Sequence, residues 1–167
     1  MLQPLTRRTW APRGATPVLR AWDRHDRLTA ITALALTPKR RRCRLYFQLL
    51  RHNATGDDFF WFLVQLHHEI PRDLIVVWDR LSGHRKAARY FKEFDCRWLQ
   101  FEYLPPYCPE LDPVEHVWTT TKWGRLANWP APDIDQLEEK VHQDLQDQDR
   151  NVQLLKGHFR WAGLSLD

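Results

Sequence analysis

The spacing of apolar and polar residues changes several times along the chain, and each change indicates an expected helix or strand. The most apolar run, Leu74–Trp78, ends at Asp79. Continuous apolar runs of this kind are typical of strands buried on both faces, as in parallel sheets between helices. A further strand is expected over Trp98–Leu104, because two prolines follow it directly.

The first third of the chain predicts short antiparallel strands bounded by polar turns. The expected elements are a β-hairpin over residues 15–38 (strands Val18–Trp22 and Leu28–Leu36, polar turn 23–27), a basic turn at Lys39–Arg42 and a third strand at Leu45–Leu49.

Helices are expected where apolar residues recur three and four positions apart and where start and stop signals flank them. They are a helix over 58–69 capped by Asp57 and Asp58 and ended by Pro71, a helix over 84–94, a helix that begins at Pro113, and a helix from Ile134 to about Gln146 with Asp133 and Gln136 as its capping box. The order predicts an α/β fold with a mixed sheet flanked by helices, in one domain over residues 1–167. Many folds share this order, so it indicates no function by itself.

Composition narrows the class of protein. The 167 residues are 43% hydrophobic and include nine Trp, which favours a folded domain with a substantial core. The sequence has neither an apolar run long enough to span a membrane nor an apolar stretch typical of a signal peptide, so we expect a cytoplasmic protein without a membrane partner. Three widely spaced Cys support neither a disulfide framework nor a zinc site.

The net charge of +4 is unevenly distributed along the chain. Residues 1–52 contain twelve Lys and Arg but only two acidic residues, whereas residues 133–149 contain seven acidic residues and one Lys. A basic segment of this kind fits a polyanionic partner such as nucleic acid, because Lys and Arg displace counterions from phosphates. A solvated basic surface is the competing interpretation.

Asp79 is the first candidate for chemistry because it follows the most apolar strand. Functional groups in open α/β sheets gather at the carboxyl ends of strands. A carboxylate at that position is rigidly placed and available to a hard cation. An ordinary turn Asp, bonded to nearby backbone N–H groups, explains the position equally well.

Glu115 is the second candidate, in the run Asp112-Pro113-Val114-Glu115. This run also reads as a capping box, with Asp112 as the N-cap and Glu115 three residues into the helix, and that role requires no catalysis. Between Asp79 and Glu115 lie 35 residues, enough for a helix, a strand and a loop that return Glu115 to the end of the Asp79 strand. Paired carboxylates repel each other unless cations lie between them, and Mg²⁺ needs few protein ligands because it keeps several waters.

These residues stand in a pattern that resembles a known family. Trp78-Asp79, His84, the proline-rich stretch 104–115 (LPPYCPELDPVE) and Trp118 are similar to the bacterial insertion-sequence transposases of the mariner superfamily, as is the stretch Arg7–Gly14. The resemblance covers nearly the whole chain. It implies an RNase H-like DDE catalytic domain that binds DNA at transposon ends and performs Mg²⁺-dependent (or Mn²⁺-dependent) strand cleavage and strand transfer.

Carried over residue by residue, the resemblance implies that Asp79 and Glu115 are the second and third catalytic carboxylates and ligate the metal. It implies that His84 is a supporting residue that orients the site or contacts DNA, although a polar residue in the first turn of a helix is an equally good interpretation. Asp112 stands where the family usually has Asn, so it keeps a helix cap and adds a negative charge.

The beginning of the chain departs from the family pattern. There the first catalytic Asp lies on an opening strand upstream of the stretch that Arg7–Gly14 resembles, whereas this sequence begins at Met1 and has no acidic residue before Asp23. Asp23 and Asp26 fall in the expected turn, which accounts for them without catalysis. We therefore expect an N-terminally truncated domain without its opening strand, its first Asp and a helix-turn-helix domain, and with impaired activity.

The expected truncation leaves two features of the protein open, its partner and its activity. The missing part could be supplied by a second polypeptide, or the chain could act in a homodimer. The alternative function is a catalytically dead remnant that binds DNA or a transposase.

Overall fold

The computed structural model describes residues 5–19 and 27–166, and its strands form two separate pairs. Strands β1 (Thr29–Leu36) and β2 (Cys43–Leu50) are antiparallel, with Thr29 opposite Leu50 and Leu36 opposite Cys43. Strands β3 (Leu74–Trp78) and β4 (Leu99–Tyr103) are parallel. In the described residues, the expected mixed sheet is thus divided into two sheets, an antiparallel pair and a parallel pair, that are not hydrogen-bonded to each other.

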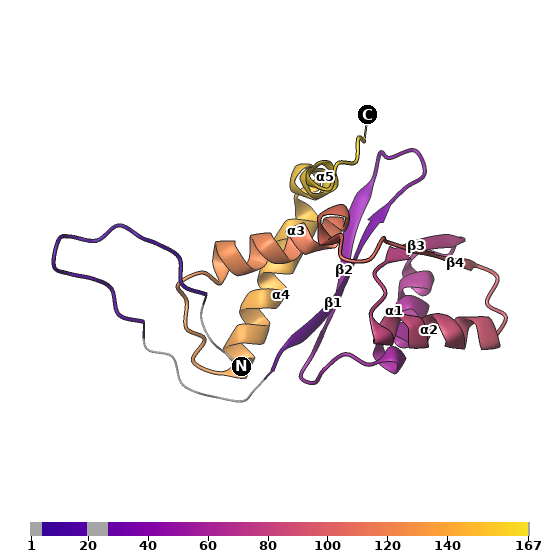
Figure 1. Ribbon diagram of the computed structural model, residues 1–167, viewed down its shortest axis with the longest axis horizontal. Coiled ribbons are helices and arrows are strands. Elements are labelled where there is room, and N and C mark those ends of the chain that lie inside the picture. Colours follow the sequence, from indigo (N-terminus) through magenta and orange to yellow (C-terminus); the bar gives the residue numbers. More distant parts are fainter. Residues whose placement is uncertain (1–4, 20–26, 167) are drawn as a thin grey trace.

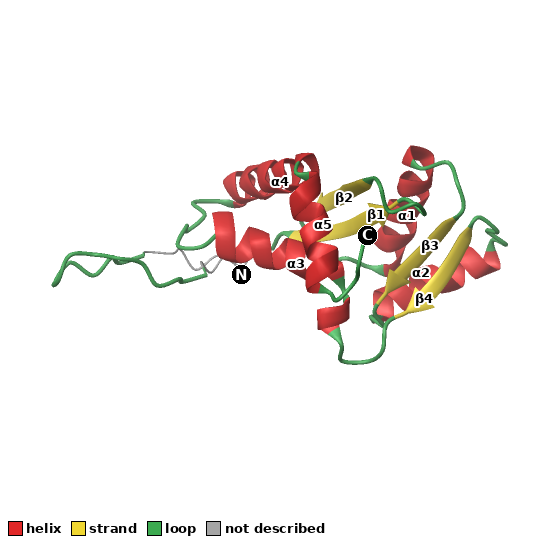
Figure 2. Ribbon diagram, turned by 90° about the horizontal axis from the view of Figure 1, so that it is seen from above, coloured by secondary structure: helices red, strands yellow, loops and turns green. Residues whose placement is uncertain are grey.

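Helices pack against both strand pairs (Figures 1 and 2). They are α1 (Gly56–Glu69), α2 (Ser82–Glu93), the 3-10 helix η1 (Pro109–Leu111), α3 (Pro113–Thr120), the π-helix η2 (Thr121–Arg125), α4 (Ile134–Arg150) and α5 (Val152–Trp161). Figure 2 shows α3, α4 and α5 gathered beside the first sheet and α2 beside the second. None of the helices in the described residues is long and apolar enough to cross a membrane.

The antiparallel pair separates two hydrophobic cores because its side chains alternate between its faces. On one face Ile31 and Leu50 pack into the core formed with α1, α2 and the second sheet. On the other face Cys43 and Leu45 pack against α3, α4 and α5. The helix α1 supplies much of the first core, and its residues in that core are Phe59, Phe62, Leu63 and Leu66. The β1–β2 sheet therefore connects the core around α1, α2 and the second sheet with the core around α3, α4 and α5.

Several expected elements are confirmed. The strand Leu74–Trp78 has the predicted bounds, and α2 and β4 differ from their predicted ranges by no more than two residues at either end. Asp112 and Asp133 are N-caps, as predicted. The basic stretch Lys39–Arg42 lies in the connection between β1 and β2.

Other expectations are wrong, each for an identifiable reason. The partner of the strand Leu28–Leu36 is residues 43–50, not Val18–Trp22, because the tight turn at 37–42 brings β2 directly beside it. Residues 18 and 19 are in no strand, and residues 20–22 lie outside the described part of the chain.

The helix α1 begins earlier than predicted, because Thr55 rather than an Asp is its N-cap. Thr55 accepts from Asp58 N–H at 3.4 Å, and Asp58 accepts from Thr55 N–H at 2.8 Å, which completes a capping box. The helix α4 continues to Arg150, and α5 was not predicted at all.

The apolar strand β3 is not buried on both faces. Trp78 is buried, but Ile75 and Val77 are 68% and 57% exposed. The buried face of β3 packs against α2 and α1, whereas no described element covers the opposite face. The five-residue run therefore predicts the strand correctly, but the prediction that both faces of this strand are buried is wrong.

Candidate active site

Asp79 lies directly after β3, in the turn that leads into α2. Its Oδ1 accepts a hydrogen bond from Leu81 N–H at 2.9 Å, and the Nδ1 of His84 lies 2.6 Å from the same oxygen. The side chain of Asp79 is 61% exposed. The carboxylate of Asp79 is thus held in place through Oδ1, and the rest of the group is open to solvent.

His84 lies in the first turn of α2 and is held by aromatic rings. Its imidazole stacks on Trp78, with centroids 4.6 Å apart and planes 8° from parallel. The ring of Phe59, from α1, meets it edge to face at 4.3 Å. Aromatic contacts of both geometries are favourable, so three elements fix the direction of this imidazole.

Glu115 and Asp112 lie at the beginning of α3. The side chain of Asp112 accepts from Val114 N–H at 3.0 Å, which confirms its role as N-cap. The predicted capping box is not formed, because the Asp112 side chain accepts from Val114 N–H and not from Glu115 N–H, and the backbone N–H of Asp112 donates to Pro109 instead of to Glu115. The exposed carboxylate of Glu115 has no hydrogen bond or ion pair with any described residue. Capping therefore accounts for Asp112 and leaves the carboxylate of Glu115 available.

The electrostatics of Asp112 show that the predicted site residues lie near one another. Burial is the largest cause that raises the pKa of Asp112 above its ordinary value of 3.8. The negative charges of Glu115 and Asp79 raise this pKa further, whereas the hydrogen bond from Val114 and the charge of His84 lower it. Glu115, Asp79 and His84 are therefore within electrostatic range of Asp112. The predicted convergence of the Asp79 and Glu115 carboxylates on one cation stays a prediction.

The predicted site residues provide carboxylate oxygens, which are hard ligands, but they do not form a complete coordination sphere for a metal ion. No three His, Cys, Asp or Glu side chains in the described residues are grouped so that they could hold a metal ion together. Asp79 and Glu115 supply two carboxylates, and Asp112 uses one oxygen to cap α3. A site of this kind suits a cation that keeps most of its water ligands, as Mg²⁺ does. The metal-binding and catalytic roles of these residues stay predictions, and Asp23 and Asp26 lie outside the described residues.

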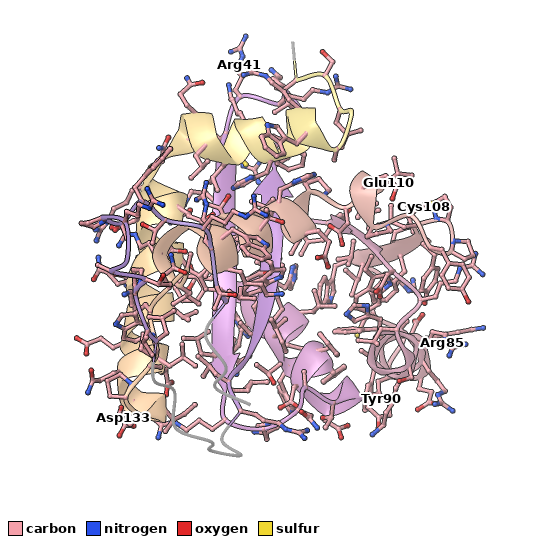
Figure 3. All side chains as sticks on the ribbon, turned by 60° about the vertical axis from the view of Figure 1, so that its left-hand side comes forward. Arg41, Arg85, Tyr90, Cys108, Glu110 and Asp133 are labelled. Carbon is pink, nitrogen blue, oxygen red and sulfur yellow. The ribbon has the colours of Figure 1, made fainter. Side chains whose placement is uncertain are left out.

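The basic residues Lys39–Arg42 are exposed and form no ion pairs with described residues. Figure 3 shows Arg41 at the end of the β1–β2 hairpin, beyond α5 and away from Cys108 and Glu110 in the loop that leads to α3.

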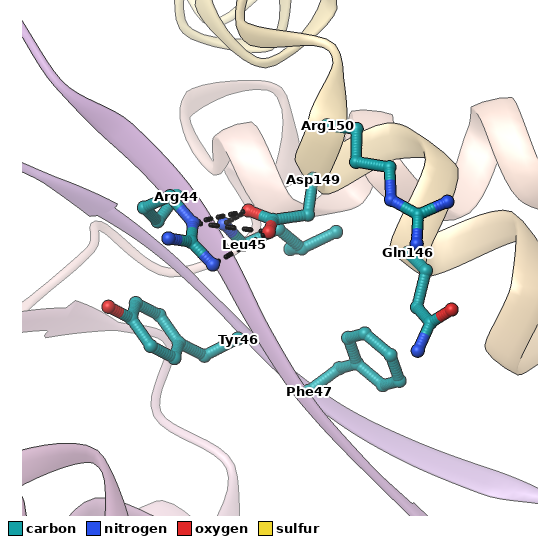
Figure 4. Close-up of a pocket in the computed structure, with 7 residues that line it drawn as sticks. All are labelled: Arg44, Leu45, Tyr46, Phe47, Gln146, Asp149 and Arg150. Carbon is teal, nitrogen blue, oxygen red and sulfur yellow. Dashed lines mark hydrogen bonds and ion pairs between the residues drawn. The ribbon is translucent and has the colours of Figure 1, made fainter. Parts of the chain in front are cut away.

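A separate hollow lies between β2 and the end of α4 (Figure 4). Asp149 occupies its centre, where it accepts from the backbone N–H of Leu45 at 2.8 Å and pairs with Arg44 at 2.9 Å. The lining residues include none of the predicted site residues; they are Arg44, Leu45, Tyr46, Phe47, Gln146, Asp149 and Arg150. The hollow thus lies where the end of α4 contacts β2 of the first sheet, and it is not part of the candidate site.

The sequence interpretation missed the rings that surround His84 and a buried polar cluster between α4 and α5. Trp78 was recognisable as the residue before Asp79, but no spacing in the sequence brings Phe59 to His84. In the polar cluster, Asp144 accepts from Thr121 at 2.6 Å and from Gln148 at 2.8 Å, and His158 lies 3.3 Å from Gln148. These polar residues occur on amphipathic helices, where the sequence alone indicates solvent exposure.

Comparison with known proteins identifies the family. The sequence matches the family described as DDE superfamily endonuclease over residues 1–138. No curated protein sequence matches the chain.

Two solved structures are similar in fold. One is the crystal structure of the Mos1 strand transfer complex, with a TM-score of 0.54 at 14% identity over 96% of this chain and 46% of that chain. The other is the Mos1 transposase paired-end complex with left transposon end, with a TM-score of 0.53 at 11% identity over 98% of this chain and 52% of that one. The chain thus spans about half the length of these structural relatives. The match confirms the predicted RNase H-like α/β fold, and the chain belongs to the family of DDE superfamily endonucleases.

Proposed function

We propose that residues 1–167 form one catalytic domain of a cytoplasmic DNA transposase. In this proposal Asp79 and Glu115 hold a divalent cation, Mg²⁺ or Mn²⁺, for strand cleavage and strand transfer at transposon ends. The observation that carries the proposal is the position of the two carboxylates, Asp79 directly after β3 and Glu115 in the first turn of α3, in a chain of the DDE endonuclease family; the pKa of Asp112, which both charges raise, agrees with it. Two acidic groups that raise the pKa of a third form a place where a cation is favoured.

The two carboxylates suit such a cation in different ways. Asp79 is fixed by the end of β3 and by the first turn of α2, and Glu115 projects from the first turn of α3 without a partner in the described residues. When bound, divalent ions stabilise the charge that develops on the attacking and leaving oxygens during phosphoryl transfer. Asp112 caps α3 and so fixes the turn from which Glu115 projects.

DNA is the proposed substrate for two reasons. The names of the structural relatives refer to strand transfer and to a transposon end. In addition, the side chains of Lys39–Arg42 are exposed and have no ion pair with a described acidic residue, so they would favour a phosphate backbone. We expect cleavage by this chain to be weak, because the family resemblance identifies only two of the three catalytic carboxylates, Asp79 and Glu115, among its residues.

Cleavage of labelled DNA that carries a transposon end, in the presence of Mg²⁺ or Mn²⁺, tests this function. The variants Asp79→Asn and Glu115→Gln keep the shape of each side chain and remove its charge, and each should abolish the cleavage. The matched control is Glu110→Gln, which removes an exposed carboxylate from the neighbouring loop. Cleavage that survives in both site variants would refute the assignment.

The alternative function is a catalytically inactive chain that binds DNA or a transposase. The observation in its favour is that no three ligand side chains in the described residues are grouped around one metal position. Gel-shift measurements beside the cleavage assay separate the two functions. DNA binding that depends on Lys39–Arg42, without cleavage under either metal, would favour the alternative.

A second polypeptide is part of the proposal because two sheet edges are left unpaired. The register of β1 and β2 directs the backbone groups of Thr32 and Leu34 away from β2, and the ladder of β3 and β4 directs those of Ile75 and Val77 away from β4. None of these groups bonds to a described backbone group. Figure 2 shows β1 and β3 as the neighbouring edges of the two sheets. Unpaired edges of this kind accept a further strand.

Hydrogen exchange tests this part of the proposal. The amides of Thr32, Leu34, Ile75 and Val77 should exchange quickly in the isolated chain and slowly after a strand is supplied by a partner, whereas the already paired amide of Leu104 should not change. Sedimentation of the isolated chain distinguishes a homodimer from the need for another polypeptide. Slow exchange of the four amides in the monomer would contradict the unpaired edges.

A further inference from the structure

The two oxygens of the Asp79 carboxylate have different surroundings. Oδ1 accepts from Leu81 N–H at 2.9 Å and lies 2.6 Å from Nδ1 of His84. Oδ2 has no hydrogen bond or ion pair with any residue in the described ranges. The protein therefore holds this carboxylate through one oxygen and leaves the other oxygen free to bind a ligand.

His84 is well suited to hold a neighbour in a fixed direction, because its own ring has little freedom. Only 16% of its side chain is exposed. It stacks on Trp78, which is itself stacked on Phe101 at 4.7 Å and 9°, so rings from α2, β3 and β4 are layered together. Phe59 closes the edge of the imidazole at 4.3 Å. The direction of the Nδ1–H bond is thus set by packing and not by Asp79 alone.

The turn geometry explains only one of the two contacts to Oδ1. The bond from Leu81 N–H closes a short turn at the start of α2, where Leu81 supplies no side-chain cap. That turn would form with any residue at position 84. The bond from His84 adds a second donor to the same oxygen and restrains rotation of the carboxylate about its last side-chain bond.

We propose that His84 is a positioning residue for the divalent cation. In this arrangement its Nδ1–H donates to Oδ1 of Asp79 and so directs Oδ2 towards the cation shared with Glu115. The inference rests on the proposed function, because it requires that Asp79 bind a metal ion. It assigns His84 to the support of a metal ligand, the first of the two roles that the family resemblance leaves open for it. Outer partners of this kind orient metal ligands, and their loss reduces metal affinity about 10-fold to 100-fold.

Two substitutions separate the hydrogen bond from the ring packing. His84→Phe keeps an aromatic ring that stacks on Trp78 and removes the donor. His84→Asn keeps a donor at the position of Nδ1 and removes the ring. His68→Phe is the matched control, because His68 is exposed on α1 and makes no hydrogen bond or ion pair with a described residue.

The readouts are the affinity for Mn²⁺, measured on the purified chain by electron paramagnetic resonance, and the urea midpoint of unfolding. His84→Phe should weaken Mn²⁺ binding about 10-fold or more and leave the urea midpoint nearly unchanged. His84→Asn should lower the midpoint but retain most of the affinity. In the wild-type chain without metal, the ¹⁵N spectrum of the imidazole should show Nδ1 protonated.

The outcomes distinguish this inference from the proposed function. If Asp79→Asn abolishes Mn²⁺ binding but His84→Phe does not change it, the positioning role is wrong and the metal site stands. If Mn²⁺ affinity follows the urea midpoint in both His84 variants, His84 is only structural. If Asp79→Asn binds Mn²⁺ as tightly as the wild type, the metal site is wrong and the positioning role fails with it. A deprotonated Nδ1 in the metal-free chain would also overturn the inference.

Discussion

His158 should make the stability of the protein depend on pH, and the size of the effect follows from its surroundings. It lies on α5 with only 4% of its surface exposed, and its Nε2 is 3.3 Å from Oε1 of Gln148. Burial, which disfavours the charged imidazolium, and to a smaller extent the charge of His116 together lower the pKa of His158 from its ordinary 6.5 to about 4. The folded protein therefore keeps His158 neutral, whereas the unfolded chain protonates it.

The sign of the effect follows from proton linkage. Between pH 6.5 and about 4 the unfolded state binds more protons at His158 than the folded state does, so the free energy of unfolding falls as the pH falls. The contribution of His158 is complete above pH 6.5 and is lost by about pH 4. At about 1.4 kcal/mol per pH unit, the loss amounts to about 3 kcal/mol over the whole window and about 2 kcal/mol between pH 7 and pH 4.5.

Urea unfolding of the wild type and of His158→Gln, at several pH values from 7 to 4.5, measures this contribution. Glutamine retains a donor for Gln148 and does not titrate, so the difference in stability between the two proteins should shift by about 2 kcal/mol in favour of the variant as the pH falls. Carboxylates titrate in both proteins and cancel in the difference. The exposed His68→Gln variant is the control and should show no such shift. A pH-independent difference between the wild type and His158→Gln would refute the reasoning.

Three further predictions concern caps and sheet edges, and urea unfolding measures each of them. Thr55→Ala removes the N-cap of α1 and should cost about 1 kcal/mol, whereas Thr55→Ser should cost much less. Asp112→Asn keeps the cap acceptor and removes a buried charge whose pKa is raised above 3.8, so the variant should be more stable than the wild type at neutral pH, with a gain that disappears below pH 3.8. Asp149→Ala leaves the backbone N–H of Leu45 without its acceptor and should cost about 1 to 3 kcal/mol, whereas Arg44→Ala loses only an exposed ion pair and should cost less than about 1 kcal/mol.

The sequence predicts those parts of the fold that are determined by local signals. The run Leu74–Trp78 predicts β3 residue for residue, because five apolar residues before an Asp have few other solutions. The N-caps Asp112 and Asp133 are predicted for the same reason, since a side-chain acceptor before a helix acts within three residues. The site residues are also predicted to lie together, because the chain between them has the length of one helix, one strand and one loop.

Strand pairing, helix position and side-chain exposure depend on residues that are distant in the sequence, and local signals do not predict them. The strand β1 had two possible partners of similar composition, and only the tight turn at 37–42 decides for β2. The helix α5 has few start signals, and its position depends on the burial of Leu155 and Phe159 against the first sheet. The exposure of Ile75 and Val77 depends on what covers the second sheet, which the five residues of β3 cannot encode.

The two candidate carboxylates follow one physical pattern, and this pattern explains why local sequence interpretation could not decide their role. Asp79 closes a turn at the start of α2 with Oδ1, and its Oδ2 has no partner in the described residues. At the start of α3 two residues divide these roles. Asp112 caps the helix. The carboxylate of Glu115, expected to complete the capping box, has no partner among the described residues. At each helix start one backbone N–H donates to a carboxylate, and a further carboxylate oxygen has no partner in the described residues. A residue pattern typical of a cap is therefore no argument against a ligand role, because a carboxyl group, or a pair of them, has enough oxygens for both.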